Sequence, residues 1–281
     1  MNEFSIIGTI GYLLLAPVAG GFLSGLEHFI LNKIREEKGG DLLKPFRDIA
    51  EQAKQSGPQE EKKQSAIAAS FFVITVLSGC FFFAGGSLAV TILLSTLSGI
   101  VYAGGIYVSQ SDNHIIKAES ELLRTAAHLT FFYLTAFGFY LLVGFDTGRG
   151  SFNVSDVINL GVSAAFYLPG MLVGIVSLII LLPRTSLIGN TDVSGYSGRN
   201  LVFLEVGRWY ENILLLGFVF LLNYGGTAIS AVITTVICLL IYFLRMFMTA
   251  PLSGKNPSII IYTAELIALI LSFVNIVVLL S

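Results

Sequence analysis

The chain has 281 residues, of which 54% are hydrophobic and 12% are charged, and its mean hydropathy is +0.81. Soluble domains carry about 25% charged residues, roughly twice this fraction. The composition therefore excludes a soluble globular protein. The net charge of -2 says nothing by itself about nucleic acid, but the chain has no basic domain, so we expect no nucleic-acid partner. We expect a single, all-α, polytopic membrane domain over residues 1–281.

Eight apolar runs are long enough to cross a bilayer, for which a helix needs about 20 mainly apolar residues. The first is preceded by Met-Asn-Glu-Phe rather than by a basic segment, so we expect a retained span and not a signal peptide. The predicted spans are residues 4–30, 65–83, 87–109, 118–144, 157–182, 204–223, 226–247 and 258–280.

A long polar segment, residues 31–64, separates the first two runs. Glycines break the first helix there, and Pro45 can occupy the first turn of a new helix, where its missing N–H costs nothing. The pattern predicts a short amphipathic helix on the membrane surface, with charges on one side. Its apolar residues recur at helical spacing: Leu42, Leu43, Phe46, Ile49, Ala50 and Ala53.

The basic residues predict which side of the membrane each loop faces. With eight spans, all but one of the 16 Lys and Arg residues fall on the same side, and the exception is Arg149. Cytoplasmic loops carry the excess of Lys and Arg. We therefore expect a multi-pass protein of the cytoplasmic membrane with both termini outside. Its two large cytoplasmic surfaces would be the loops at 31–64 and 183–203.

Ionisable residues cluster where the fourth predicted span begins. Glu121 and Arg124 are three residues apart, so they can share a helix face and form a pair, and His128 extends the same stripe. Two interpretations remain open, an interfacial cluster that pairs internally or the start of a proton path. The candidates are Glu119, Glu121, Arg124 and His128.

A second group opens the sixth span, where Glu205, Arg208 and Glu211 can lie roughly on one side of the helix. Pairing of Arg208 with one glutamate would leave the other carboxylate needing a partner or a proton. Trp209 and the tyrosine after it are predicted to be interface anchors. Glu265, isolated in the eighth span, is either a proton carrier or an interhelical hydrogen-bond partner.

No cofactor site is expected in this chain. Cys80 and Cys238 lie within apolar runs, and an iron–sulfur cluster needs about four thiolates. The three histidines are scattered, so they form no metal-binding pattern. Paired glycines at 20–21, 85–86, 104–105 and 225–226 are expected to permit close helix packing.

Three sequence blocks, in matching order and with matching span count, resemble one family. Residues 35–48 (REEKGGDLLKPFRD) look like a first loop that runs from arginine through glycine–proline and Leu-Gln-Pro to an aspartate. Residues 121–128 (ELLRTAAH) are similar to a Leu-Arg-x-x-Ala-Gln start of the fourth span. Residues 195–205 (GYSGRNLVFLE) look like a Glu-Tyr-Ser-Gly-Arg block entering the sixth. The family is the membrane subunit shared by complex I, as its subunit 1, and the energy-converting membrane-bound nickel–iron hydrogenases, including formate hydrogenlyase.

The chain also departs from the family's pattern. Gly40 stands where proline is common, Lys44 where glutamine is common, Leu134 where a glutamate follows tyrosine, and Gly195 where a glutamate precedes tyrosine. The loss of acids favours the hydrogenase branch over quinone chemistry. Either other acids substitute or the ion is coupled differently. The acids that could substitute are Glu119, Glu121, Glu205, Glu211 and Glu265.

The resemblance implies a membrane-anchor and ion-coupling subunit without a catalytic centre of its own. Nickel–iron and iron–sulfur centres would belong to soluble large and small subunits on the cytoplasmic face, with antiporter-like subunits alongside in the lipid. Ferredoxin-linked hydrogen chemistry would then drive H⁺ or Na⁺ translocation. The expected docking residues are Arg35, Lys44, Pro45, Arg47, Asp48, Tyr196 and Arg199. The alternatives are a stand-alone secondary transporter and a structural anchor without pumping.

Overall fold

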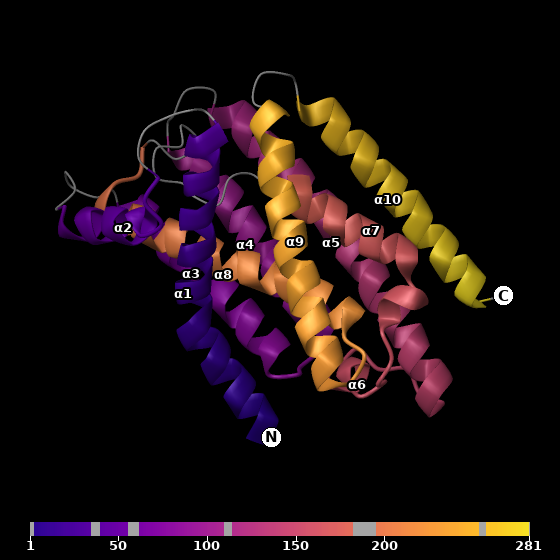
Figure 1. The fold of residues 1–281 in the computed structure, drawn as a ribbon. Coiled ribbons are helices and arrows are strands. Elements are labelled where there is room, and N and C mark those ends of the chain that lie inside the picture. Colours follow the sequence, from indigo (N-terminus) through magenta and orange to yellow (C-terminus); the bar gives the residue numbers. More distant parts are fainter. Residues whose placement is uncertain are drawn as a thin grey trace. The chain divides into compact units, whose positions relative to one another are not determined.

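The computed structural model describes residues 3–34, 40–55, 62–109, 114–181, 195–252 and 257–280. These ranges are almost entirely helical, and within them the only β-type pairing is an isolated bridge between Ser87 and Asn153 (Figure 1). The elements are α1 (Glu3–Ile34), α2 (Lys44–Lys54), α3 (Lys62–Phe83), α4 (Leu88–Val108), α5 (His114–Thr147), α6 (Val154–Ile158), the 3₁₀ helix η1 (Ala164–Phe166), α7 (Pro169–Leu181), α8 (Gly198–Asn223), α9 (Ala228–Leu252) and α10 (Pro257–Leu280). The predicted all-α class is confirmed for the described residues.

Among the residues that the structure describes, five helices are long and apolar enough to cross a membrane. They are Ile6–Ile30 within α1, the whole of α3, α4 and α5, and Ala228–Arg245 within α9. Large apolar side chains on these helices face outward, for example Leu14 and Leu240. Only a lipid environment, or another apolar protein surface, accommodates such helices, whose backbone groups are bonded within the helix. The chain is therefore a helical membrane protein.

The described residues do not show the predicted count of eight spans, since five of their helices qualify. Seven of the eight predicted apolar runs each coincide with one helix, but the run predicted at 157–182 is not continuous. Helix α6 ends at Ile158, η1 follows, and α7 begins only at Pro169. Gly161 adopts a φ of 68°, a left-handed conformation that glycine allows at no steric cost. Pro169 has no N–H to donate, so it starts a helix more readily than it continues one. The prediction of one continuous helix here is wrong for these reasons.

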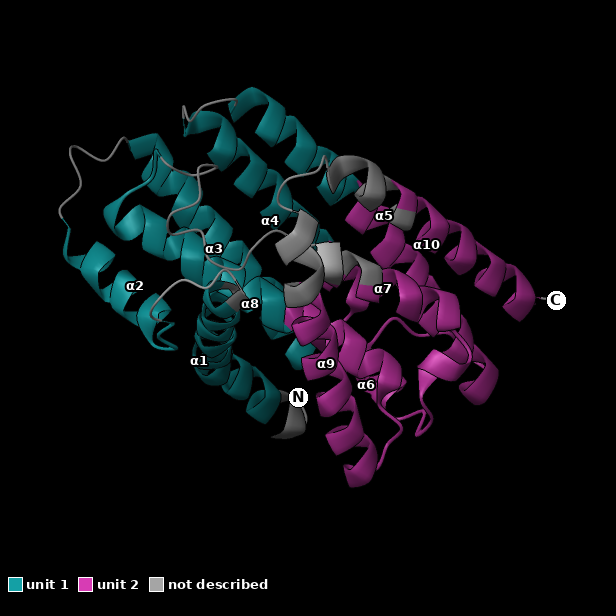
Figure 2. Ribbon diagram, turned by 45° about the horizontal axis from the view of Figure 1, so that its top comes forward, with its two compact units in different colours: residues 1–84, 93–126, 184–213 teal, residues 85–92, 127–183, 214–281 magenta. Residues whose placement is uncertain are grey.

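The contacts divide the chain into two compact units rather than one (Figure 2, teal and magenta). The first unit contains residues 1–84, 93–126 and 184–213, and the second contains residues 85–92, 127–183 and 214–281. Helices α4, α5 and α8 each contribute to both. The first unit therefore holds α1, α2 and α3, most of α4, the start of α5 and the first part of α8.

Tyrosines join the helices of the first unit. The hydroxyl of Tyr12 on α1 donates to the carbonyl of Tyr210 on α8 at 3.1 Å, and the hydroxyl of Tyr210 donates to the carbonyl of Leu13 at 2.7 Å. Tyr12 also stacks on Phe83 of α3, with ring centroids 4.7 Å apart. Gly79 leaves room for the Tyr12 ring against α3. These reciprocal contacts bring the start of α8 against α1 and α3.

In the second unit α7 packs against both α9 and α10. The side chain of Asn275 on α10 accepts a hydrogen bond from the backbone N–H of Gly170 at 2.6 Å. Its amide donates to the carbonyl of Tyr167 at 3.4 Å. The first backbone N–H groups of any helix lack partners within it, so Asn275 satisfies one that the break before α7 leaves open.

We expect Asn275→Ala to lower the free energy of unfolding by about 1–3 kcal/mol, because the buried N–H of Gly170 loses its acceptor. Thermal unfolding of the purified chain in detergent measures the loss. Asn223→Ala is the control, since the amide of Asn223 donates to the carbonyl of Val219 in its own helix. Equal losses in the two variants would contradict this role for Asn275.

Candidate functional site

Four charged side chains meet inside the first unit, and we call them the charge cluster: Glu121 and Arg124 of α5, with Arg208 and Glu211 of α8. Arg208 donates to Glu211, with Nη1 2.7 Å from Oε2, and to Glu121, with Nη2 3.4 Å from Oε1. Arg124 forms an ion pair with the same oxygen of Glu121. Two cations and two carboxylates are thus joined in one chain of contacts.

Helical spacing explains half of this arrangement. Glu121 and Arg124 are three residues apart, as are Arg208 and Glu211, so each pair lies on one helix face. The predicted Glu121–Arg124 pair and the predicted pairing of Arg208 with one glutamate are both confirmed. The link between helices, from Arg208 to Glu121, was not predicted from the sequence, because it depends on how α5 and α8 pack.

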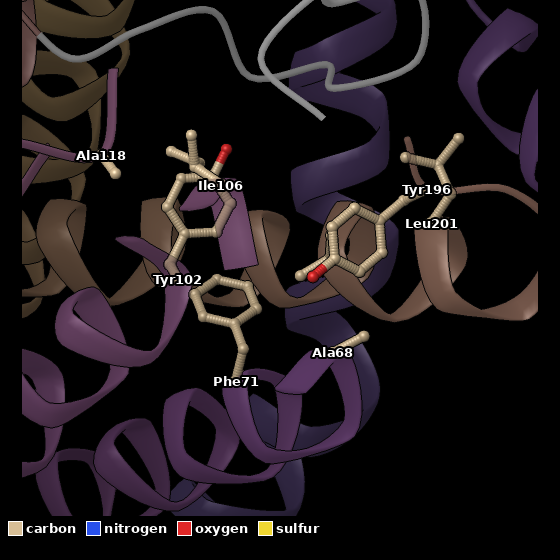
Figure 3. Close-up of a cluster of buried hydrophobic side chains, with 8 residues drawn as sticks. Ala68, Phe71, Tyr102, Ile106, Ala118, Tyr196 and Leu201 are labelled. Atoms are coloured by element: carbon tan, nitrogen blue, oxygen red, sulfur yellow. The ribbon is translucent and has the colours of Figure 1, made fainter. Parts of the chain in front are cut away.

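A tyrosine on a third helix completes the surroundings of Arg208. The guanidinium carbon lies 3.9 Å from the centroid of the Tyr102 ring on α4, a cation–π contact. Tyr102 belongs to a buried apolar group that Figure 3 shows around the ring. Its members are Ala68, Phe71, Tyr102, Ile106, Ala118, Tyr196, Leu201 and Leu204. A tyrosine within an apolar run carries no sequence signal for this contact, so the sequence analysis missed it.

Arg208 is the most demanding member of the cluster because it is only 5% exposed. A buried charge is tolerated only when it is paired and hydrogen-bonded. Within the described residues its Nε has no hydrogen-bond partner. The positive charge of Arg208 is therefore balanced by the two carboxylates and the Tyr102 ring. Protonation of either glutamate would leave positive charge in excess. The cluster can therefore respond to a proton by changing its pairing.

A further carboxylate lies one helical turn before Arg208. Glu205 is fully buried and accepts a hydrogen bond from the indole of Trp209, with Nε1 3.1 Å from Oε1. Glu205 is the carboxylate of the sixth predicted span that does not pair with Arg208 in this way, and the indole N–H gives it a hydrogen-bond donor. Glu205 therefore lies close in sequence to the charge cluster on α8, but its hydrogen bond is to Trp209.

The prediction that Trp209 and Tyr210 are interface anchors is wrong. The two side chains are 2% and 6% exposed, inside the first unit. The adjacent glycines on α1 make room for them, because a Cβ on Gly20 would lie 2.6 Å from the Cβ of Trp209. A Cβ on Gly21 would meet both Trp209 and Phe46. The expected close packing at this glycine pair is confirmed.

The remaining ion-coupling candidates are not brought into the cluster. Glu119 is exposed on α5. His128 lies in the second unit, half-buried, with its ring edge-on to Phe132 at 6.3 Å. Glu265 falls within α10, but its side chain lies outside the described residues.

Of the predicted docking residues, four lie on α2, which Figure 1 shows crosswise beside α1. The helix was expected, and Pro45 does occupy its first turn. Arg47 is exposed and pairs with Asp41, Asp48 is half-buried, and the Nζ of Lys44 lies 3.0 Å from Nε2 of His28 on α1. Pro45 itself is buried, so it supports the surface without forming it.

The start of α8 supplies the other described docking candidates. Arg199 is exposed, whereas Tyr196 is buried and donates its hydroxyl to the carbonyl of Gly105 at 3.2 Å. Burial raises the pKa of Tyr196 to about 12. The backbone N–H of Gly198 donates to the side chain of Gln52 on α2 at 3.2 Å. Helix α2 is therefore in contact with the 195–205 segment through two residues that are 146 positions apart. Arg35 lies outside the described residues.

No metal site is found in the described ranges, where no three His, Cys, Asp or Glu side chains gather. Cys80 and Cys238 are free thiols. Comparison of the chain with protein-family models and with curated proteins gives no match.

We expect Arg208→Met to lower the free energy of unfolding by about 3–5 kcal/mol, because it leaves two partly buried carboxylates without their shared cation. Adding Glu211→Gln in the same chain should recover part of the loss, since one uncompensated charge is removed. Thermal unfolding in detergent measures both variants. Arg199→Met, on the exposed start of the same helix, should change stability by less than about 0.5 kcal/mol. No recovery in the double variant would contradict the coupling.

The raised pKa of Tyr196 predicts a loss of stability at alkaline pH. A tyrosine ordinarily ionises near pH 10, and a higher folded-state pKa means that the unfolded chain releases the proton first. The stabilisation is fully present below pH 10 and is lost as pH rises through about 12. Unfolding temperatures of the wild type and of Tyr196→Phe should therefore converge over this window. The exposed Tyr167 provides the control through Tyr167→Phe, which leaves Tyr196 in place.

Proposed function

We propose that this chain is the membrane-anchor and ion-coupling subunit of an energy-converting hydrogenase-like complex. In this proposal it crosses the cytoplasmic membrane eight times with both termini outside, and it binds no redox centre. Nickel–iron and iron–sulfur centres belong to soluble large and small subunits that dock on the cytoplasmic loops. Antiporter-like subunits contact its lipid-facing helices, and H⁺ or Na⁺ moves as ferredoxin electrons reduce protons.

One observation supports this proposal above the others. The first unit brings a surface helix, α2, into contact with the same helix, α8, that carries the buried charges. An anchor without a coupling role has no need of a guanidinium held between two glutamates away from water. Burying a charged group costs free energy, and charges buried in membrane proteins therefore usually serve a function.

The charge cluster provides a means of coupling. A change of charge in a docked redox partner alters the field at α2 and the start of α8, and buried carboxylates respond by changing protonation or pairing. Glu121 is the pivot, because it accepts from both Arg124 and Arg208. A proton on Glu121 would release both guanidiniums and leave Arg208 with Glu211. This exchange uses only side chains in contact in the structure.

Copurification in mild detergent tests the assignment most directly. We expect partner subunits containing nickel and iron to purify with the chain, as metal analysis and mass spectrometry of the complex would show. A stable solitary protein would contradict the proposal and favour a stand-alone secondary transporter.

Ion uptake into vesicles tests the coupling role. Ferredoxin-driven uptake per hydrogen formed should fall at least about tenfold in Glu121→Gln, because loss of a proton-transferring group typically costs a factor of about 10²–10⁴. Glu205→Gln and Glu265→Gln should also reduce it. Glu119→Gln, at an exposed position on the same helix as Glu121, is the control and should leave uptake unchanged. Normal uptake in Glu121→Gln, Glu205→Gln and Glu265→Gln alike would reduce the chain to a structural anchor.

A further inference from the structure

One aromatic residue touches both the surface helix and a buried carboxylate. On one side the Trp209 ring meets Phe46 of α2 edge-on, with centroids 5.3 Å apart and planes inclined at 66°. On the other side its indole N–H donates to Glu205. Phe46, which is half-buried, also contacts Phe22 of α1, with ring centroids 6.5 Å apart. Trp209 therefore connects α2 to Glu205 through two direct contacts.

The indole has little freedom to adjust independently of these contacts. Gly20 places the α1 backbone directly against the Trp209 backbone, and a Cβ on Gly21 would lie 2.7 Å from the Cζ3 atom of the indole. Close packing of this kind transmits displacement because it cannot be compressed. If Phe46 is withdrawn, the space it leaves is on the α2 side of the ring. The ring can then turn only by moving its N–H relative to Glu205.

Glu205 stands next to the charge cluster in the helix. It precedes Arg208 by three residues and Trp209 by four, so its carboxylate and the guanidinium rise from adjacent turns of α8. A hydrogen bond to a carboxylate stabilises the charged form, and removing the donor favours protonation. A change at Trp209 thus alters the charge balance beside Arg208 without any direct contact between α2 and the cluster.

We propose that Trp209 is a positioning residue that links the place of α2 to the hydrogen bonding of Glu205. The link itself is a property of this chain alone. Only the event that would displace α2, the docking of a soluble redox partner, rests on the proposed function. Displacement of α2 withdraws Phe46, the indole turns, and Glu205 loses an N–H donor.

The chain contains a single tryptophan, so the hydrogen bond can be observed directly. Ultraviolet resonance Raman spectroscopy of the full-length chain in detergent reports the indole N–H band, which shifts when its acceptor weakens. We expect Phe46→Ala to shift the band in the same direction as Glu205→Gln. Phe72→Ala is the matched control, because Phe72 lies in the same unit and packs against Phe203 and Tyr210. A wild-type band in Phe46→Ala would overturn the proposal.

Ion coupling in the assembled complex provides the second measurement. Trp209→Phe keeps an aromatic ring beside Phe46 but removes the N–H. It should lower ion uptake per hydrogen formed while partner subunits copurify as in the wild type. Tyr107→Phe, at an exposed position of α4 in the same unit, is the control and should leave coupling unchanged. Equal coupling in Trp209→Phe and the wild type would overturn the role assigned to Trp209.

The two measurements separate this proposal from the proposed function. If no redox partner copurifies but Phe46→Ala shifts the indole band, the assigned complex is wrong and the link between α2 and Glu205 stands. If partners copurify and the band does not move, the complex stands and the link is overturned.

Discussion

Burial of Arg208 is the constraint on which the first unit depends. A guanidinium cannot be deprotonated in a protein, so its charge has to be met by neighbours. Glu211 comes from its own helix, Glu121 from α5 and the Tyr102 ring from α4. Three helices must therefore stay in register around one side chain. Arg124 in turn balances the second carboxylate, so that the four charges sum to zero.

Close approach of helices makes this arrangement possible. Gly20 and Gly21 let α1 lie against Trp209, and Gly207 lets Phe71 of α3 lie against α8. Helices in a bilayer gain little from burying apolar surface, so packing and hydrogen bonds decide which faces meet. Here the reciprocal hydroxyl bonds of Tyr12 and Tyr210 add direction to the packing. The result is that the part of α8 within the first unit, which carries both Glu205 and Arg208, is packed against α1 and α3.

The surface helix α2 contacts this part of α8 at two points. Phe46 and Gln52 of α2 reach the Trp209 ring and the N–H of Gly198, respectively. These contacts lie on two sides of α2, whereas its exposed residues, such as Arg47 and Glu51, remain available to a partner.

Sequence patterns predicted most of the elements because local composition decides them. Seven apolar runs became single helices, and Pro45 and the glycines before it marked where α2 would begin. The run at 157–182 failed because hydropathy does not register a left-handed turn at Gly161 or a helix start at Pro169. The ion pairs within one helix, Glu121–Arg124 and Arg208–Glu211, could also be predicted from the sequence, because the partners are three residues apart.

By itself, then, the sequence determined an all-α membrane protein, its short surface helix and two charged helix faces, since each follows from the residues of one segment. Tertiary structure alone decided that those faces meet at Glu121, that Tyr102 stacks on Arg208 and that Trp209 is buried. Each of these depends on which helices approach one another and at what rotation. That choice is made by glycines and tyrosines on other helices, and nothing in the segment itself records it.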